Sequence, residues 1–224
     1  MATNFPSSLD SFTNPSGTDA MDSVTVPHAT QHANLNDAVE ALEAKVGVDG
    51  SAVTGSLDYK VANQGLVLVK SVAVGSGVSS VTVTNAFSAT FDNYEIIMSG
   101  GTQTSTTDVK LKLGSSATGY YGFLAYGSVT SSTVNGATRN NATQFNWVGG
   151  PSGVGEATHA SFQLFAPYLS MYTKIRNAGY QNGNNYGTMQ GEHQVASSYT
   201  SFELFVDAGL LSGGTIRVYG YNNG

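Results

Sequence analysis

The feature that most constrains this chain is a two-residue alternation of apolar and polar side chains, which recurs from Gly65 to the C-terminus. In the clearest run, Val109, Leu111 and Leu113 alternate with Asp108, Lys110 and Lys112. Successive side chains of a strand point to opposite faces of a sheet. The run therefore predicts a half-buried β-strand, with its valine and leucines turned toward a core.

Similar runs follow one another at intervals of about 8–12 residues, separated by turn-forming residues. They predict strands over residues 66–74, 81–84, 94–98, 120–126, 144–148, 159–166, 171–176, 186–195, 201–206 and 215–219. Many short strands with regular turns are typical of a β-sandwich or jelly roll. We therefore expect a mainly β fold, a β-sandwich of about ten strands over residues 65–224.

A helical pattern precedes the strands. Leu35, Val39, Leu42 and Val46 recur at spacings of four, three and four, and Gly47 is a suitable stop. They predict a short helix over residues 35–46, within a segment 28–48. Isolated helices below about 12–15 residues are marginal in water, so this apolar stripe needs another surface. That surface is either the chain's own β-domain or a coiled coil with sister chains.

The segments on either side of this helix favour self-association. Residues 49–64 are rich in Gly, Ser and Asp and predict a linker that detaches the helix from the β-domain. Residues 1–27 carry Pro6, Pro15 and Pro27 among many Ser, Thr and Asp, which predicts an extended arm. Such an arm is either a flexible tail or a segment that orders against a neighbouring subunit.

The distribution of charge along the chain limits the classes of partner that it can bind. Residues 1–60 hold eight acidic residues against two lysines, whereas residues 61–224 hold seven acidic and seven basic residues. A neutral β-domain has no long-range field to gather phosphates, so we expect no nucleic-acid partner. No apolar run approaches the roughly 18 residues of a membrane helix, and we expect no membrane insertion. The N-terminus lacks a basic and an apolar region, so we do not expect a secretory signal.

No catalytic motif is present. The sequence contains no Gly-x-Ser-x-Gly elbow, no phosphate-binding Gly-rich loop and no cysteine. His28 and His32 are four residues apart, but we interpret them as an exposed pair rather than as metal ligands. We therefore expect no catalytic residue, no metal and no cofactor, and a chain that is not an enzyme.

Aromatic and amide residues gather near the expected loops in residues 127–157 and 177–193. Aromatic rings stack on the apolar faces of sugars, while amides bond to hydroxyls. The candidate contacts for a surface glycan are Trp147, Tyr180, Asn182, Asn184 and Tyr186. The alternative is that the aromatic residues pack at the edge of the sandwich and the Asn-Gly pairs form ordinary turns.

Two N-terminal motifs, FPSSLDSFTNP over residues 5–15 and HANLNDAVEALEAKVG over residues 32–47, resemble the N-terminal segment of tailed-bacteriophage fibre and appendage proteins. In the β-region, FDNYEII (91–97), KLKL (110–113), GYY (119–121) and GGTIRVYG (213–220) are similar to C-terminal modules of phage tails. The resemblance implies a virion component that is anchored through residues 1–48 to other virion proteins. It also implies a homotrimer, although Val39 and Val46 at a with Leu35 and Leu42 at d favour two strands.

The expected function is therefore a structural virion protein, a tail fibre or fibre-like appendage that displays a β-sandwich for host attachment. A capsid decoration protein, whose arm would clamp coat subunits, is the first alternative. A fibre-borne polysaccharide depolymerase is a further one.

Overall fold

The computed structural model describes residues 17–24, 27–63 and 65–223. The chain divides into two compact units, residues 1–64 and residues 65–224. Most of the predicted arm, residues 1–16 and 25–26, lies outside the described residues. The two units are called here the N-terminal unit and the β-unit.

Helix α1 of the N-terminal unit spans His28–Val46 and is longer than predicted. Pro27 forms the N-cap, and its carbonyl accepts a hydrogen bond from the Gln31 N–H. The helix ends at Gly47, whose φ of 87° lies in a region that favours glycine. The predicted start of the helix at Leu35 was too late. The residues before Leu35 can form a helix, but apolar residues do not recur among them at helical spacing.

A second helix, α2 (Leu57–Ala62), lies in the segment that was predicted to be a linker. Ser56 caps it, because its Oγ accepts a hydrogen bond from the Tyr59 N–H. The Ser56 hydroxyl also donates to the Val53 carbonyl at 2.8 Å. The sequence analysis missed this helix because six residues are too few to show a helical period, and only the cap signals its start.

The β-unit has a mainly β fold, as predicted, and its described residues 65–223 form thirteen strands where about ten were expected. Their bounds are β1 Leu66–Ala73, β2 Ser76–Val78, β3 Ser80–Val83, β4 Asn93–Gln103, β5 Val109–Leu113, β6 Tyr120–Ser128, β7 Thr133–Ala142, β8 Phe145–Pro151, β9 Ala157–Phe165, β10 Thr173–Asn182, β11 Asn185–His193, β12 Phe202–Phe205 and β13 Leu211–Tyr221. Strands β2 and β7 were missed. Strand β7 (TVNGATRNNA) has almost no apolar residues, so its sequence resembles a loop.

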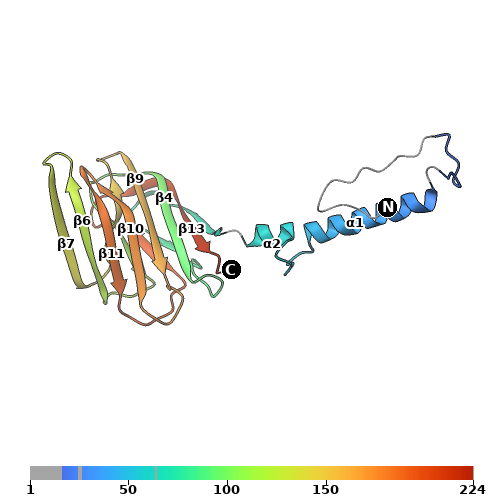
Figure 1. The fold of residues 1–224 in the computed structure, drawn as a ribbon. Helices are drawn as coiled ribbons and strands as arrows, with labels where there is room; N and C mark the ends of the chain where they lie inside the picture. Colours follow the sequence, from blue (N-terminus) through green and yellow to red (C-terminus); the bar gives the residue numbers. More distant parts are fainter. Residues whose placement is uncertain (1–16, 25–26, 64, 224) are drawn as a thin grey trace. The chain divides into compact units, whose positions relative to one another are not determined.

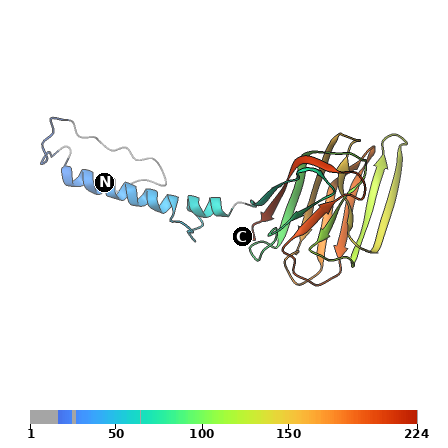
Figure 2. The same ribbon diagram turned by 180° about the vertical axis from the view of Figure 1, so that it is seen from behind.

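Every strand pair is antiparallel, and the strands form two layers that meet at β9. One edge of β9 pairs with β4 along its length. The other edge pairs with β10 near Phe165 and with β8 near Thr158, so the sheet forks there. The long layer runs β7-β6-β11-β10-β9-β4-β13-β1, and the short layer runs β8-β5-β12-β3. Figure 1 shows the strands of the long layer in this order, and in Figure 2, seen from behind, β7 again lies at its outer edge.

The core fills the space between the two layers. In the clearest predicted strand, β5, burial alternates as expected, with Val109, Leu111 and Leu113 buried. Aromatic rings join the layers: the ring of Tyr120 in β6 lies 4.8 Å from that of Phe145 in β8, in an edge-to-face arrangement. Strand β8 is buried throughout, so this part of the expected 127–157 loop region is core.

Candidate binding surface on the long layer

Two of the predicted ligand contacts belong to the core. Trp147 and Tyr180 are each only 5% exposed. The Trp147 ring is covered by Arg139, whose Cζ lies 4.5 Å from the ring centroid. The Tyr180 hydroxyl donates a 2.7 Å hydrogen bond to Asp108. The prediction that these rings stack on a ligand is therefore corrected: burial leaves neither ring an open face.

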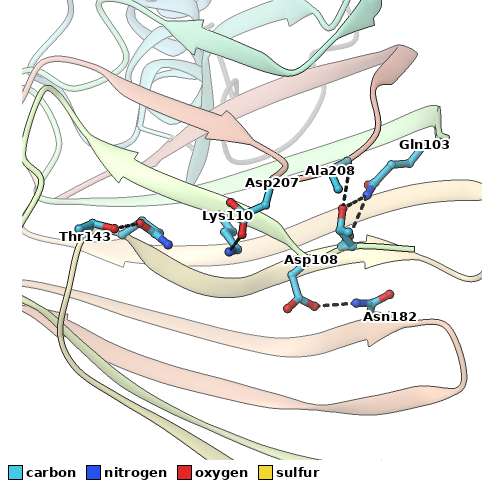
Figure 3. Close-up of polar contacts among 9 residues, drawn as sticks. Gln103, Asp108, Lys110, Thr143, Asn182, Asp207 and Ala208 are labelled. Atoms are coloured by element: carbon cyan, nitrogen blue, oxygen red, sulfur yellow. Dashed lines mark hydrogen bonds and ion pairs between the residues drawn. The ribbon is translucent and has the colours of Figure 1, made fainter. Parts of the chain in front are cut away.

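The other predicted contacts lie at the tip of the β10–β11 hairpin. The Asn182 side chain donates to Asp108 Oδ1 at 2.8 Å, a contact drawn in Figure 3, so this amide is held by the protein itself. Asn184 is exposed, and its carbonyl accepts a hydrogen bond from the Val129 N–H. Tyr186 is 48% exposed, and its hydroxyl accepts a hydrogen bond from the Gln181 amide at 2.9 Å. Of the five predicted contacts, Asn184 and Tyr186 remain open to a partner.

The fold also creates a surface that no segment of the sequence showed: the face of the long layer turned away from the core. One row of side chains crosses this outer face from strand to strand. Direct cross-strand neighbours, in order from β7 to β4, are Thr138, Phe123, Gln190, Arg176, Gln163 and Glu95. These residues come from six separate stretches of chain, so only the strand register brings them together.

A hollow with a volume of about 520 Å³ lies over strands β7, β6, β11 and β10. Its floor and walls combine rings, amides and a hydroxyl, and Phe123 is 43% exposed. Apart from two glycines, the lining residues are Tyr121, Phe123, Thr138, Arg139, Lys174, Gln190, Glu192 and Gln194, so charged groups of both signs are among them. The volume lies within the range of small-molecule sites, roughly 300–1,000 Å³, although the hollow is shallow.

A second hollow, with a volume of about 250 Å³, lies beside the first on β4, β9 and β10. Arg176 lines this second hollow and is the direct cross-strand neighbour of Gln190, which lines the first. Hydrogen bonds fix its polar side chains: Arg176 Nε donates to Gln163 Oε1 at 3.1 Å, and the Gln163 amide donates to the Tyr221 hydroxyl at 2.6 Å. The Tyr221 hydroxyl in turn donates to Glu95 at 3.0 Å. Burial, together with this hydrogen bond to Glu95, raises the pKa of Tyr221, so the donor keeps its proton at neutral pH.

Charges of both signs lie on this face. Lys174 and Glu192 are direct cross-strand neighbours, and Arg176 and Glu95 line the second hollow together. Gln194 donates to Glu192 Oε1 at 2.9 Å, which leaves this carboxylate partly satisfied. The face therefore has no block of one charge that would select a phosphate or another polyanion.

One serine–histidine pair has the composition of a catalytic dyad but a different setting. The Ser116 hydroxyl and His193 Nε2 are 2.8 Å apart. His193 is completely buried, and its ring packs against those of Tyr120 and Tyr199. Burial lowers the pKa of His193, against the opposing effect of backbone groups of Thr118 and Val195. A base that no substrate can reach has a structural role here.

The histidines of the N-terminal unit also pair. The Nε2 atoms of His28 and His32 are 3.0 Å apart on the exposed surface of α1. Within the described ranges 17–24, 27–63 and 65–223, no group of three or more His, Cys, Asp or Glu side chains is placed to hold a metal. In the same ranges no helix is long and apolar enough to cross a membrane.

The predicted assembly residues form an exposed stripe on α1. Leu35, Val39, Leu42 and Val46 are 58%, 45%, 52% and 44% exposed, respectively. Their spacing places them on one side of the helix, and Ala44 lies on the opposite side. The prediction that this stripe packs on sister chains stays a prediction, and the single chain leaves its apolar side chains uncovered.

Comparison of the chain with protein-family models, with curated proteins and with solved structures found no significant match.

Proposed function

We propose that this chain is a non-enzymatic attachment protein of a bacteriophage virion, a tail fibre or fibre-like appendage. In this proposal the N-terminal unit anchors the protein to other virion proteins and assembles it into a homotrimer. The β-unit then binds the surface of the host cell. The proposal extends the resemblance of residues 5–15 and 32–47 to fibre and appendage proteins.

The observation that carries the proposal is the outer face of the long layer. Two adjacent hollows, of about 520 and 250 Å³, combine exposed rings with amide, hydroxyl and charged groups. Concave surfaces that combine aromatic side chains with a few placed polar groups are the usual form of ligand sites. Rigid strands position the side chains, which limits the entropy lost on binding.

The stripe on α1 supports the assembly part. Leu35 and Leu42 are more than half exposed, and burying each of them would contribute about 1.5–3 kcal/mol at most. A coiled coil with sister chains buries this stripe along its whole length. Several linked copies would then strengthen a weak single-site contact, because the second and third binding events become intramolecular.

The test has two parts, location and adsorption. Gold-labelled antibody against residues 65–224 should decorate the tail of intact particles, and the purified full-length chain should compete with particles for adsorption to host cells. A control uses chain unfolded by heat, which should not compete. Label confined to capsid sites would overturn the fibre proposal in favour of a decoration protein. Release of sugar from envelope polysaccharide by the purified chain would overturn the non-enzymatic part.

A further inference from the structure

The two hollows on the outer face form one continuous surface rather than two separate sites. Gln190, which lines the larger hollow, directly faces Arg176, which lines the smaller one. The row that contains them runs perpendicular to the strands, from Thr138 in β7 to Glu95 in β4. It crosses six strands and therefore five gaps of about 4.8 Å, a length of about 24 Å.

The groups along this row suit a chain of sugars. Phe123 is exposed and Tyr121 is partly exposed, so both present ring faces against which the apolar side of a sugar can stack. Amides lie on the same face as these rings: Gln190 and Gln194 line the larger hollow, and Gln163 lines the smaller. An amide both donates and accepts, which matches the mixed hydrogen bonding of sugar hydroxyls.

The charges argue against a strongly anionic ligand. Arg176 is bonded to Gln163, and Glu95 accepts from both Tyr221 and Ser161. Hydrogen bonds hold these charged groups in a network, and groups of opposite charge lie near one another. A polyphosphate or a heavily sulfated chain would meet Glu95 and Glu192 as well as the cations, and like charges repel.

We propose that the outer face of the long layer binds an extended, uncharged oligosaccharide that lies across strands β7, β6, β11, β10, β9 and β4. The inference rests on the proposed function, because it names the ligand class of the attachment surface. Sugar rings stack on Phe123 and Tyr121, and Gln190 and Arg176 bond to their hydroxyls. A length of about 24 Å accommodates several linked sugar residues, so a monosaccharide fills only part of the site.

Titration calorimetry of the full-length chain tests the proposal. The probes are neutral oligosaccharides built from glucose, mannose, galactose or N-acetylglucosamine, each as a mono-, di-, tri-, tetra- and hexasaccharide. At least one series should bind, and its affinity should rise with chain length. Phe123→Ala should weaken binding about fivefold or more, since a lost aromatic contact is worth about 1 kcal/mol. Gln190→Ala should weaken binding of the longer members most.

Tyr172→Ala is the matched control, because Tyr172 is 49% exposed and lines neither hollow. It should leave the affinity unchanged. Circular dichroism and urea unfolding check that each variant is folded. If Phe123→Ala is unstable, Phe123→Ser and Gln190→Glu replace it, because both positions face solvent. Both variants should also weaken binding.

The outcomes separate this inference from the proposed function. Binding of no member of the series, or binding that Phe123→Ala and Gln190→Ala leave unchanged, overturns the glycan site. If the chain still competes for adsorption to cells in that case, attachment stands and its ligand is of another class. If the chain neither binds sugars nor competes for adsorption, both proposals fall. A length-independent affinity would overturn the extended site and leave a single-sugar contact.

Discussion

The Tyr180 hydroxyl donates a 2.7 Å hydrogen bond to Oδ1 of Asp108, across 72 residues of sequence. The same oxygen accepts from the Asn182 amide at 2.8 Å, so one carboxylate fastens the start of β5 to the end of β10 (Figure 3). Burial is the largest cause that raises the pKa of Tyr180, and the nearby Asp108 charge raises this pKa further. The phenol therefore stays protonated and acts as a donor. The β10–β11 hairpin is therefore held near its tip.

Asp108→Ala should destabilise the β-unit by about 1–3 kcal/mol, because the buried Tyr180 hydroxyl and the Asn182 amide both lose their acceptor. Tyr180→Phe should cost less, since it removes the donor together with its need for a partner. Urea unfolding of the two single variants and the double variant measures the coupling. Purely additive effects would contradict the hydrogen bond as a source of stability.

Leu42→Asp should reduce the oligomeric mass of the full-length chain without unfolding the β-unit. A charge placed within an apolar helix seam costs several kcal/mol when no partner relieves it. Ala44→Asp is the matched control, because Ala44 is exposed on the opposite side of α1 and its change should leave the mass intact. Light scattering gives the mass, and circular dichroism follows the strands. An unchanged mass for Leu42→Asp would mean that the stripe does not mediate assembly.

The β-unit should lose stability on acidification through its buried histidine. The pKa of His193 is lowered in the fold by burial, so the unfolded chain binds the proton more tightly than the folded chain. Stability due to this group is therefore complete above the unfolded pKa of about 6.5 and declines as the pH falls from there toward the folded pKa. Urea unfolding from about pH 7.5 to about pH 5 measures the decline.

His193→Phe is the comparison for this pH series, because phenylalanine retains a ring against Tyr120 and Tyr199. The variant loses the hydrogen bond to Ser116, so its overall stability is lower, but its slope with pH above about pH 5 should be flatter. Equal slopes in the two proteins would show that another group is responsible.

Binding of the chain to host cells should depend only weakly on salt. The outer face carries both cations and carboxylates, so little of the binding free energy comes from screened long-range attraction. Raising sodium chloride from about 50 to about 500 mM should change the affinity by less than about threefold. A loss of orders of magnitude would indicate a polyanionic ligand instead. Surface plasmon resonance on immobilised envelope fragments provides the measurement.

Residues 65–224 should fold without the N-terminal unit. All the described strands lie in this segment, and together they form one core. The isolated segment should show the same far-UV dichroism and the same urea midpoint as the β-unit of the full-length chain. A random-coil spectrum would contradict this division. A lower affinity for cells than that of the full-length chain is expected, because the copies are no longer linked.

Local patterns predicted much of this protein. The alternation of Val109, Leu111 and Leu113 predicted β5, although the predicted run began one residue early at Asp108, because a sheet with one buried face requires a period of two. Leu35 to Val46 predicted the second half of α1 in the same way, since an apolar stripe at spacings of four, three and four is helical. The mainly β class followed from these periods without any knowledge of pairing.

Only the tertiary structure decided which side chains meet. Trp147 and Tyr180 lie near expected loops in the sequence, but the fold buries both in the core. No local pattern in the sequence indicated that Phe123, Gln190 and Arg176 lie together. Cross-strand register aligns them on one face. Register depends on contacts between strands that lie far apart in the sequence, and a shift of one residue would turn each of these side chains to the opposite face.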